Sequence, residues 1–263
     1  PAGAPAGAAL PRGGPPAGWE FGLETSHALM LPAAFERAAG SAGLLEGDAR
    51  LGATRFLGQG SLLSLGLRQG WREFDWRSSA DFVAPHREPF GRIDATGLDL
   101  FHRRPLSDSW SGQLVASLSS AREERADWGP SWTGLAALSF RHQWTDAFAL
   151  SLGAVGLTRL GEGPLAFPIL LFEWKPTERL RLELFRTVRV SYLLDRDWGL
   201  EAALSGGFDY QRFRLDDRGA APGGIGEYRR IPLRLELEAA PFGRTLELCL
   251  FGGALLGQEL RLE

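Results

Sequence analysis

Residues 131–144, SWTGLAALSFRHQW, decide the fold, because two kinds of side chain alternate along them. One face carries Trp132, Leu138, Phe140 and Trp144, so it is mostly apolar and has a tryptophan at each end. The other face consists mostly of small and polar residues. A period of two is the spacing of side chains along a β-strand, so this stretch is predicted to be a strand with two unlike faces.

The same alternation recurs along most of the chain, most clearly at residues 109–120, 198–211 and 230–238. The predicted strands are residues 18–27, 48–58, 61–76, 91–103, 109–122, 131–144, 147–160, 164–175, 178–194, 196–215, 227–241 and 243–262. Several of them are longer than the five or six residues that are usual in soluble sheets. The sequence therefore predicts an all-β fold with long antiparallel strands.

The connections between these strands alternate in length. Short ones lie at Gln59-Gly60, Thr145-Asp146, 175–178 and Phe242-Gly243, and longer ones at 28–47, 77–90, 123–130 and 216–226. Short turns at one end and longer loops at the other are typical of outer-membrane barrels. We therefore expect a transmembrane up-and-down β-barrel of about twelve strands, with short periplasmic turns and longer outer loops.

The strand count depends on residues 178–194. Leu180, Leu184, Val188 and Tyr192 keep one parity, which favours a single strand and a total of twelve. The alternation of loop lengths instead favours a break near Arg186 and an odd total. A further strand after the last residue is a third alternative.

Composition excludes some function classes. The net charge of −3 offers no basic surface for nucleic acid. One cysteine, Cys249, allows no internal disulfide, and the four histidines are scattered, so no metal site and no cofactor are predicted.

Residues 1–18 are rich in Pro, Ala and Gly and are predicted to be a flexible tail, followed by one barrel domain at 19–263. The chain opens at Pro1 without a charged leader, so we expect a processed chain whose signal peptide has been removed. The tail or the loops are candidate contacts for other envelope proteins.

Two interpretations of the alternation compete. In a soluble sandwich the apolar face is the core, whereas in a membrane barrel it meets lipid and the polar face lines the lumen. Aromatics at the ends of the apolar faces favour the membrane, where they lie at the headgroup level. The predicted lipid-interface aromatics are Trp110, Trp132, Trp144, Trp198 and Tyr210. Outer-membrane lipids and lipopolysaccharide of a Gram-negative bacterium are the expected partners.

The second half of the chain resembles a family. The residues that carry the resemblance are PILLFEWKP at 168–176, LRLELF at 180–185, VRVSYLL at 188–194, the stretch from Trp198 to Tyr210, and GEYRRIPL at 226–233. Over about residues 165–260 the chain is similar to an uncharacterised family of small bacterial outer-membrane β-barrels, a domain of unknown function. The resemblance implies a barrel and the outer membrane, and it implies no catalytic or binding residues.

Charged residues gather on the polar parity of the last strands. The predicted lumen network consists of Arg179, Arg181, Glu183, Arg189, Glu201, Asp209, Arg230, Arg234, Glu236 and Glu238. Such a network is either a constriction that selects solutes or a set of ion pairs that fills the lumen. The mixed signs favour filling, and hence a structural or scaffolding barrel, for which membership of a larger envelope assembly is one alternative. A narrow solute channel is the alternative.

A lipid-modifying enzyme is the least favoured function. It needs a nucleophile and a base close together near the lipid boundary. His142 lies on the apolar parity and Ser139 on the other, so they cannot pair. We therefore predict no catalytic residues and no enzyme.

Overall fold

A computed structural model describes residues 18–34, 41–77, 89–185, 187–218, 221–241 and 245–262. These residues form fourteen β-strands and one short 3₁₀ helix, η1 (Gly129–Ser131). The predicted all-β class is thus confirmed. No helix in the described part of the chain has the length and apolar character needed to cross a membrane. The predicted tail falls almost wholly outside the described residues.

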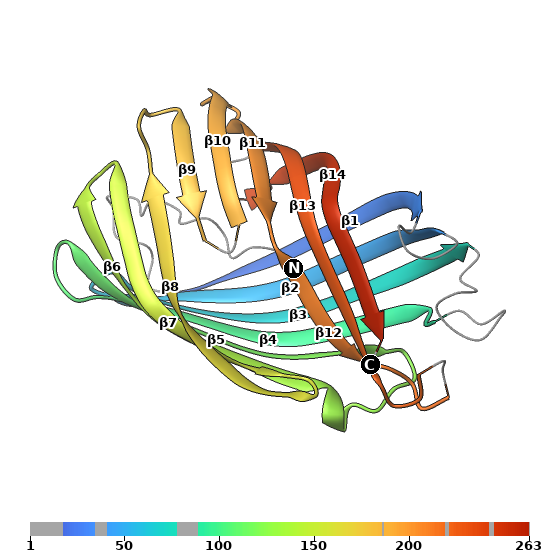
Figure 1. Ribbon diagram of the computed structural model, residues 1–263. Helices are drawn as coiled ribbons and strands as arrows, with labels where there is room; N and C mark the ends of the chain where they lie inside the picture. Colours follow the sequence, from blue (N-terminus) through green and yellow to red (C-terminus); the bar gives the residue numbers. More distant parts are fainter. Residues whose placement is uncertain are drawn as a thin grey trace.

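The first half is a regular meander, seen along the lower part of Figure 1. Its strands are β1 (Trp19–Ala34), β2 (Ser41–Gly58), β3 (Ser61–Arg77), β4 (Arg92–Pro105) and β5 (Trp110–Glu123). Each pairs antiparallel with the next over nearly its whole length. The turn between β2 and β3 is tight, and it uses positive φ at Gly58, Gln59 and Gly60.

The second half continues the sheet. Its strands are β6 (Trp132–Thr145), β7 (Phe148–Arg159), β8 (Glu162–Trp174), β9 (Leu180–Leu184), β10 (Thr187–Asp195), β11 (Leu200–Gly207), β12 (Asp209–Arg214), β13 (Ile225–Ala239) and β14 (Leu248–Leu262). The strands are shorter from β9 to β12. Both β11 and β12 pair with the same edge of β13, and β14 pairs with its other edge.

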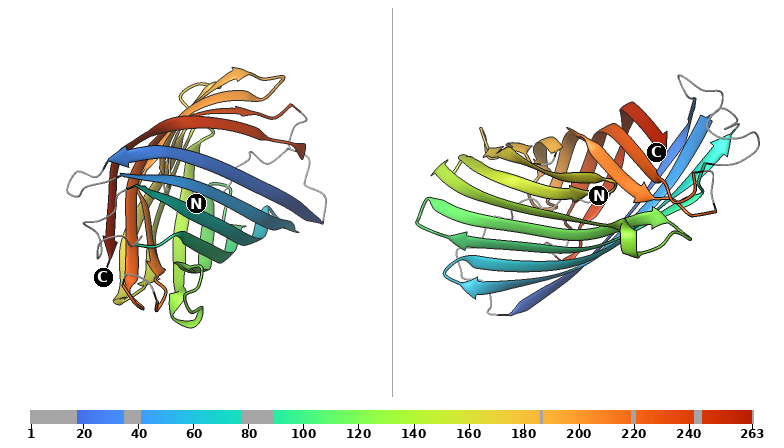
Figure 2. Two further views of the ribbon diagram at one scale, coloured as in Figure 1. Left: turned by 90° about the vertical axis from the view of Figure 1, so that its right-hand side faces the viewer. Right: turned by 60° about the horizontal axis from the view of Figure 1, so that its bottom comes forward.

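Strands β5 to β13 form a closed ring of nine. It closes where β12 meets β5 in a parallel bridge between Arg214 and Arg122, so the barrel is mixed. The five remaining strands, β1 to β4 and β14, lie outside this ring (Figures 1 and 2). The prediction of a twelve-stranded up-and-down barrel was therefore wrong in both strand number and closure.

The prediction of a single strand over 178–194 was also wrong, because β9 and β10 form a hairpin there. Leu184 pairs with Val188, so residues four apart face the same side on both arms of the hairpin. The side chains therefore keep the same alternation through the turn. Alternation alone cannot distinguish this hairpin from one long strand.

The predicted strand 196–215 divides into β11 and β12 at Phe208. The partner strand is irregular at the same level, since the register between β13 and β14 shifts between Arg230 and Pro232. Pro232 has no amide hydrogen to donate to the ladder, which explains why pairing changes there. The alternation of side chains again continues across the break, so the sequence pattern does not reveal it.

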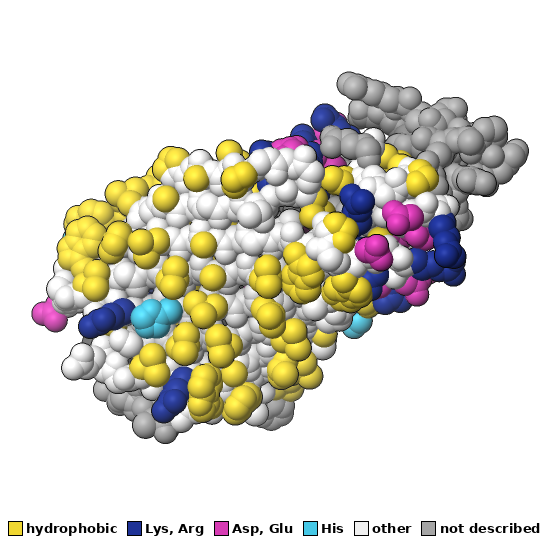
Figure 3. Space-filling view, turned by 90° about the horizontal axis from the view of Figure 1, so that it is seen from below, with side chains coloured by type: hydrophobic (Ala, Val, Ile, Leu, Met, Phe, Trp, Pro, Cys, Tyr) yellow, Lys and Arg dark blue, Asp and Glu magenta, His cyan; other side chains and the backbone are white. Residues whose placement is uncertain are grey.

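The apolar parity of the strands faces outward. Leu138 is 51% exposed and Leu235 is 64% exposed, whereas Ser139 is 4% exposed and Glu183 is 3% exposed. A sandwich buries the apolar side of each strand, so these strands are oriented in the opposite way. In the face shown in Figure 3, hydrophobic side chains lie along the middle of the strands, and charged ones gather towards the ends.

The three-strand portion of the sheet around β12 has other parts of the protein against both of its faces. We call it the inner segment and define it as β12, residues 225–230 of β13 and residues 258–262 of β14. On one side, Phe213 and Tyr228 pack against Leu44 and Phe74 of β2 and β3 in the main hydrophobic core of the described residues. On the other side, Arg212 donates to the carbonyl oxygen of Leu160, next to the β7–β8 turn.

Candidate functional site: ion pairs of the inner face

A buried network of two arginines and two carboxylates joins the inner segment to the first half of the chain. Arg230 lies 2.9 Å from a Glu46 oxygen and 2.7 Å from an Asp209 oxygen. Arg72 lies 3.2 Å from the Glu46 carboxylate and 3.5 Å from that of Asp209. Each carboxylate is therefore shared by both arginines, and strands β2, β3, β12 and β13 are held together.

Tyr228 completes this central network. Its ring lies 5.7 Å from the Arg72 guanidinium and 5.5 Å from that of Arg230, in cation–π geometry. Glu46, Asp209 and Arg230 are all buried. A buried charge is tolerated only when it is paired, so the loss of one member would leave the others uncompensated.

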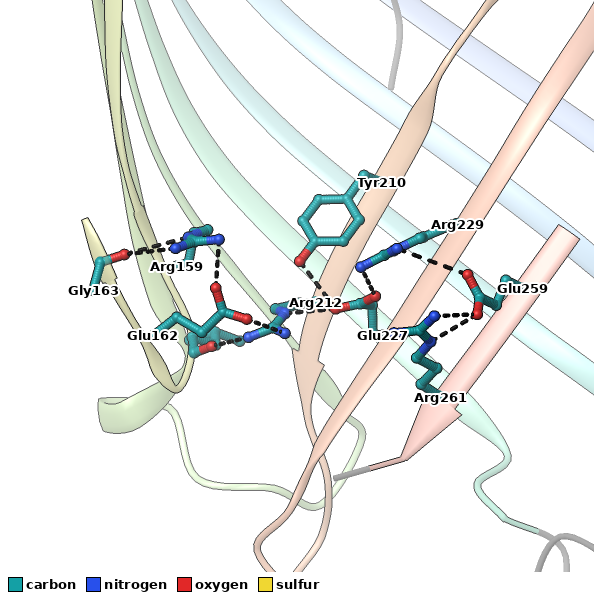
Figure 4. A network of polar contacts seen from close by, with 10 residues as sticks. Arg159, Glu162, Gly163, Tyr210, Arg212, Glu227, Arg229, Glu259 and Arg261 are labelled. Carbon is teal, nitrogen blue, oxygen red and sulfur yellow. Dashed lines mark hydrogen bonds and ion pairs between the residues drawn. The ribbon is translucent and has the colours of Figure 1, made fainter. Parts of the chain in front are cut away.

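A second network fixes the opposite face of the inner segment, and Figure 4 shows it from close by. Arg212 lies 2.5 Å from Glu162 of β8 and 2.8 Å from Glu227 of β13. The Tyr210 hydroxyl donates to Glu227, which also pairs with Arg229. The chain of pairs continues from Arg229 to Glu259 and Arg261 of β14. Both faces of the inner segment are thus anchored by charge.

A third cluster lies on the inner face of β6, β8 and β9. Glu173 is buried, and three cations approach it: Arg141 at 2.8 Å, Lys175 at 2.8 Å and Arg181 at 3.1 Å. Arg181 also lies 2.7 Å from Glu183. Positive charge exceeds negative charge in this cluster.

A fourth cluster on β10, β11 and β13 has the opposite balance. Arg189 is shared by Glu201 at 3.2 Å, Glu238 at 2.8 Å and Glu236. Ser205 donates a hydrogen bond to Glu236. Three carboxylates therefore surround one guanidinium.

Eight of the ten residues of the predicted lumen network fall into these clusters, but in separate groups. Asp209 joins Arg230 in the central network, Arg181 joins Glu183 in the third, and Arg189 joins Glu201, Glu236 and Glu238 in the fourth. The other two do not. Arg179 is exposed in the turn before β9, and the Arg234 guanidinium lies 5.4 Å from the centre of the Phe251 ring.

Four of the five predicted interface aromatics lie on the surface, and the fifth belongs to an ion-pair network. Trp110, Trp132, Trp144 and Trp198 are all exposed on the surface. Trp110 and Trp144 lie on either side of His142, with ring centres 4.5 and 4.4 Å from it. Tyr210 differs, because its hydroxyl bonds to Glu227 within the second network.

Sequence reasoning missed several residues that complete the clusters, namely Glu46, Arg72, Arg141, Glu162 and Glu173 of β2 to β8 and Arg212 and Glu227 of the inner segment. A signal was present in β2, where Glu46, Asp48 and Arg50 share one parity. Charged residues at alternate positions of β2 indicate its inward face, just as they do in the strands late in the chain.

Open space along the described residues is limited. Two depressions, one beside Asp48 and Arg50 and one beside Arg141 and Glu173, have room for no more than one or two water molecules. Pockets that hold small organic ligands usually measure about 300–1,000 Å³. Ion pairs occupy the inner face at the four clusters described above.

Comparison with known proteins gives one match. A family model described as a domain of unknown function, DUF6268, covers residues 86–254, well over half of the chain. The chain belongs to this DUF6268 family. No curated protein and no solved structure matches it. The whole nine-strand ring lies within the DUF6268 region, whereas Glu46 and Arg72 of the central network lie before it.

Proposed function

We propose that this DUF6268 protein is a bacterial outer-membrane β-barrel with a structural or scaffolding role, and that its lumen is filled. The observation that carries the proposal is the orientation of the two faces: leucines and tryptophans outward, serines and ion pairs inward. That orientation is costly in water but favourable in lipid.

The outer face supports a membrane environment. Exposed leucines follow one another across neighbouring strands, as at Leu51 of β2, Leu67 of β3 and Leu98 of β4. Soluble monomers rarely expose contiguous apolar patches beyond a few hundred Å². Burial in a bilayer would remove this surface from water, and within the nine-strand ring every strand pairs with two neighbours, as a backbone in lipid requires.

The inner segment supports a structural role rather than an open pore. It lies between the core residues of β2 to β4 and the β7–β8 turn, and it is tied to the first by buried ion pairs and to the second by the contacts of Arg212 with Glu162 and Leu160. We expect a segment held in this way to obstruct passage along the barrel. A scaffold needs such rigidity, whereas a wide pore needs an open lumen.

Fractionation and planar-bilayer recording test the two parts of the proposal separately. We expect the full chain to be recovered in the outer-membrane fraction and to require detergent for extraction. Recovery as a soluble periplasmic monomer would refute the membrane assignment. In planar bilayers we expect no stable unitary conductance. A large and steady conductance would refute the filled lumen and favour the narrow or open channel instead.

A further inference from the structure

Strands β1 and β14 each have one edge that pairs with no other strand in the described part of the chain. β1 pairs only with β2, and β14 pairs only with β13. The free edges present backbone N–H and C=O groups that water can satisfy but lipid cannot. The need to cover these edges therefore rests on the outer-membrane location proposed above.

The most exposed large apolar side chains of the described residues lie on the same two strands. Five of them are between 70% and 78% exposed: Phe21, Leu23, Leu29, Leu31 and Leu250. By contrast, Leu51 of β2, which has a neighbouring strand on each side, is 54% exposed. The additional exposure on β1 and β14 is what a strand shows when it lacks a neighbour on one side.

The two free strands run in the same direction. The pairings that lead from β1 along the sheet to β14 are all antiparallel and even in number. Their lengths also match, with 16 residues in β1 and 15 in β14. Pairing between them would therefore be parallel and could keep the apolar parity of both strands on the outer face.

One end of β14 is already held near β1. Leu260 and Leu262 pack against the main hydrophobic core, and Met30 of β1 packs against the same core. Arg230, on the neighbouring strand β13, lies 3.6 Å from the Met30 sulfur. Residues 248–255 lie beyond the register shift between β13 and β14, and most of them are exposed. This part of β14 is thus tethered close to β1 without being paired with it.

We propose that residues 248–255 of β14 pair in parallel with the free edge of β1 when the protein lies in a bilayer. The pairing supplies hydrogen-bond partners for the open backbone groups of both strands. It also joins the five strands outside the ring of nine into a continuous wall, since β1 to β4 and β14 would then be neighbours. No second protein is needed to cover either edge.

The expected register follows from the contact at Met30. Gln258 of β14 lies opposite Arg230, which places it near the level of Met30. β14 has one extra residue at its register shift with β13. Counting back along both strands from this level places Cys249 beside Gly22, and both residues belong to the inner parity.

Oxidation of the native Cys249 thiol tests the pairing in the full chain. Gly22→Cys would place a second thiol beside Cys249, whereas Gly52→Cys, on β2 opposite Gly22, would place it one strand further away. At neither glycine would an added Cβ meet an atom closer than 3.9 Å, so both variants should fold. Adjacent strands lie about 4.8 Å apart, and a disulfide cannot join Cα atoms more than about 7 Å apart. In isolated membranes we therefore expect a disulfide within one chain for Gly22→Cys and none for Gly52→Cys.

Glu20→Cys and Glu24→Cys cover a shift of two residues in either direction. In urea the unfolded Gly22→Cys and Gly52→Cys chains should form the disulfide equally, which checks the reactivity of the thiols. Absence of a disulfide at all three β1 positions, or a disulfide that joins two chains, would overturn the proposal. Absence of the disulfide in a membrane-bound protein would refute the pairing alone. Recovery of the cross-linked chain as a soluble monomer would instead refute the proposed location and leave the pairing.

Discussion

Strands β1 to β5 and strands β9 to β12 belong to the same sheet but are held in place by different forces. The first group has strands of 14 to 18 residues with nearly unbroken antiparallel ladders. The second group has strands of 5 to 9 residues, and β12 closes the ring on β5 through a single parallel bridge. The long strands are fixed by backbone pairing with their neighbours, whereas the short ones depend on side-chain ion pairs. The comparison therefore predicts which substitutions matter in each region.

The largest effect is expected from the central network. Arg230→Ala would leave Glu46 and Asp209 buried with only Arg72 to share. Removing one partner of a buried ion pair typically costs about 3–5 kcal/mol. The free energy of unfolding in detergent, measured by denaturant titration, checks this. Arg229→Ala is the matched control, because that side chain is 35% exposed and lies on the opposite face. Equal effects of the two variants would contradict the dependence of the short strands on buried pairs.

A smaller effect, common to both regions, is expected on the outer face. Leu51 of β2 and Leu235 of β13 are 54% and 64% exposed. Replacing either with Arg should cost about 2–4 kcal/mol near the middle of a bilayer. Folding equilibria in lipid vesicles measure this cost.

The exposed Leu106, in the turn between β4 and β5, provides the control for these two variants. Leu106→Arg should have little effect, since a turn lies outside the hydrocarbon layer. Tolerance of Arg at all three positions would mean that the outer face does not meet lipid.

The smallest effect is expected within the regular ladder. Thr54 of β2 donates a hydrogen bond of 3.0 Å to Ser64 of β3. Thr54→Val removes one of many contacts between strands that remain paired, so we expect a loss of about 1 kcal/mol or less. Thr25→Val, at an exposed position of β1, should be neutral and can be compared in the same unfolding experiment. A loss at Thr54 as large as at Arg230 would remove the distinction between the two regions.

Much of the fold followed from local sequence patterns, and the failures share one cause. The strands from β3 to β8 were predicted to within a few residues, because each has its own alternation. The hairpin between β9 and β10 and the break at Phe208 were missed, because parity is the same on both sides of each. The pairing of Asp209 with Arg230 could be predicted, because the two residues lie opposite each other on neighbouring strands. Their contacts with Glu46 and Arg72 join segments more than a hundred residues apart, and no local pattern indicates them.

The sequence by itself determined the all-β class, the long strands and the separation of an apolar parity from a polar one. These features arise from a period of two that every strand carries within its own residues. Only the tertiary structure decided that the apolar parity faces outward, that β12 closes a ring of nine on β5, and which charges share a partner. Those outcomes depend on where the sheet bends and which distant strands meet, and alternation along a strand carries no information about either.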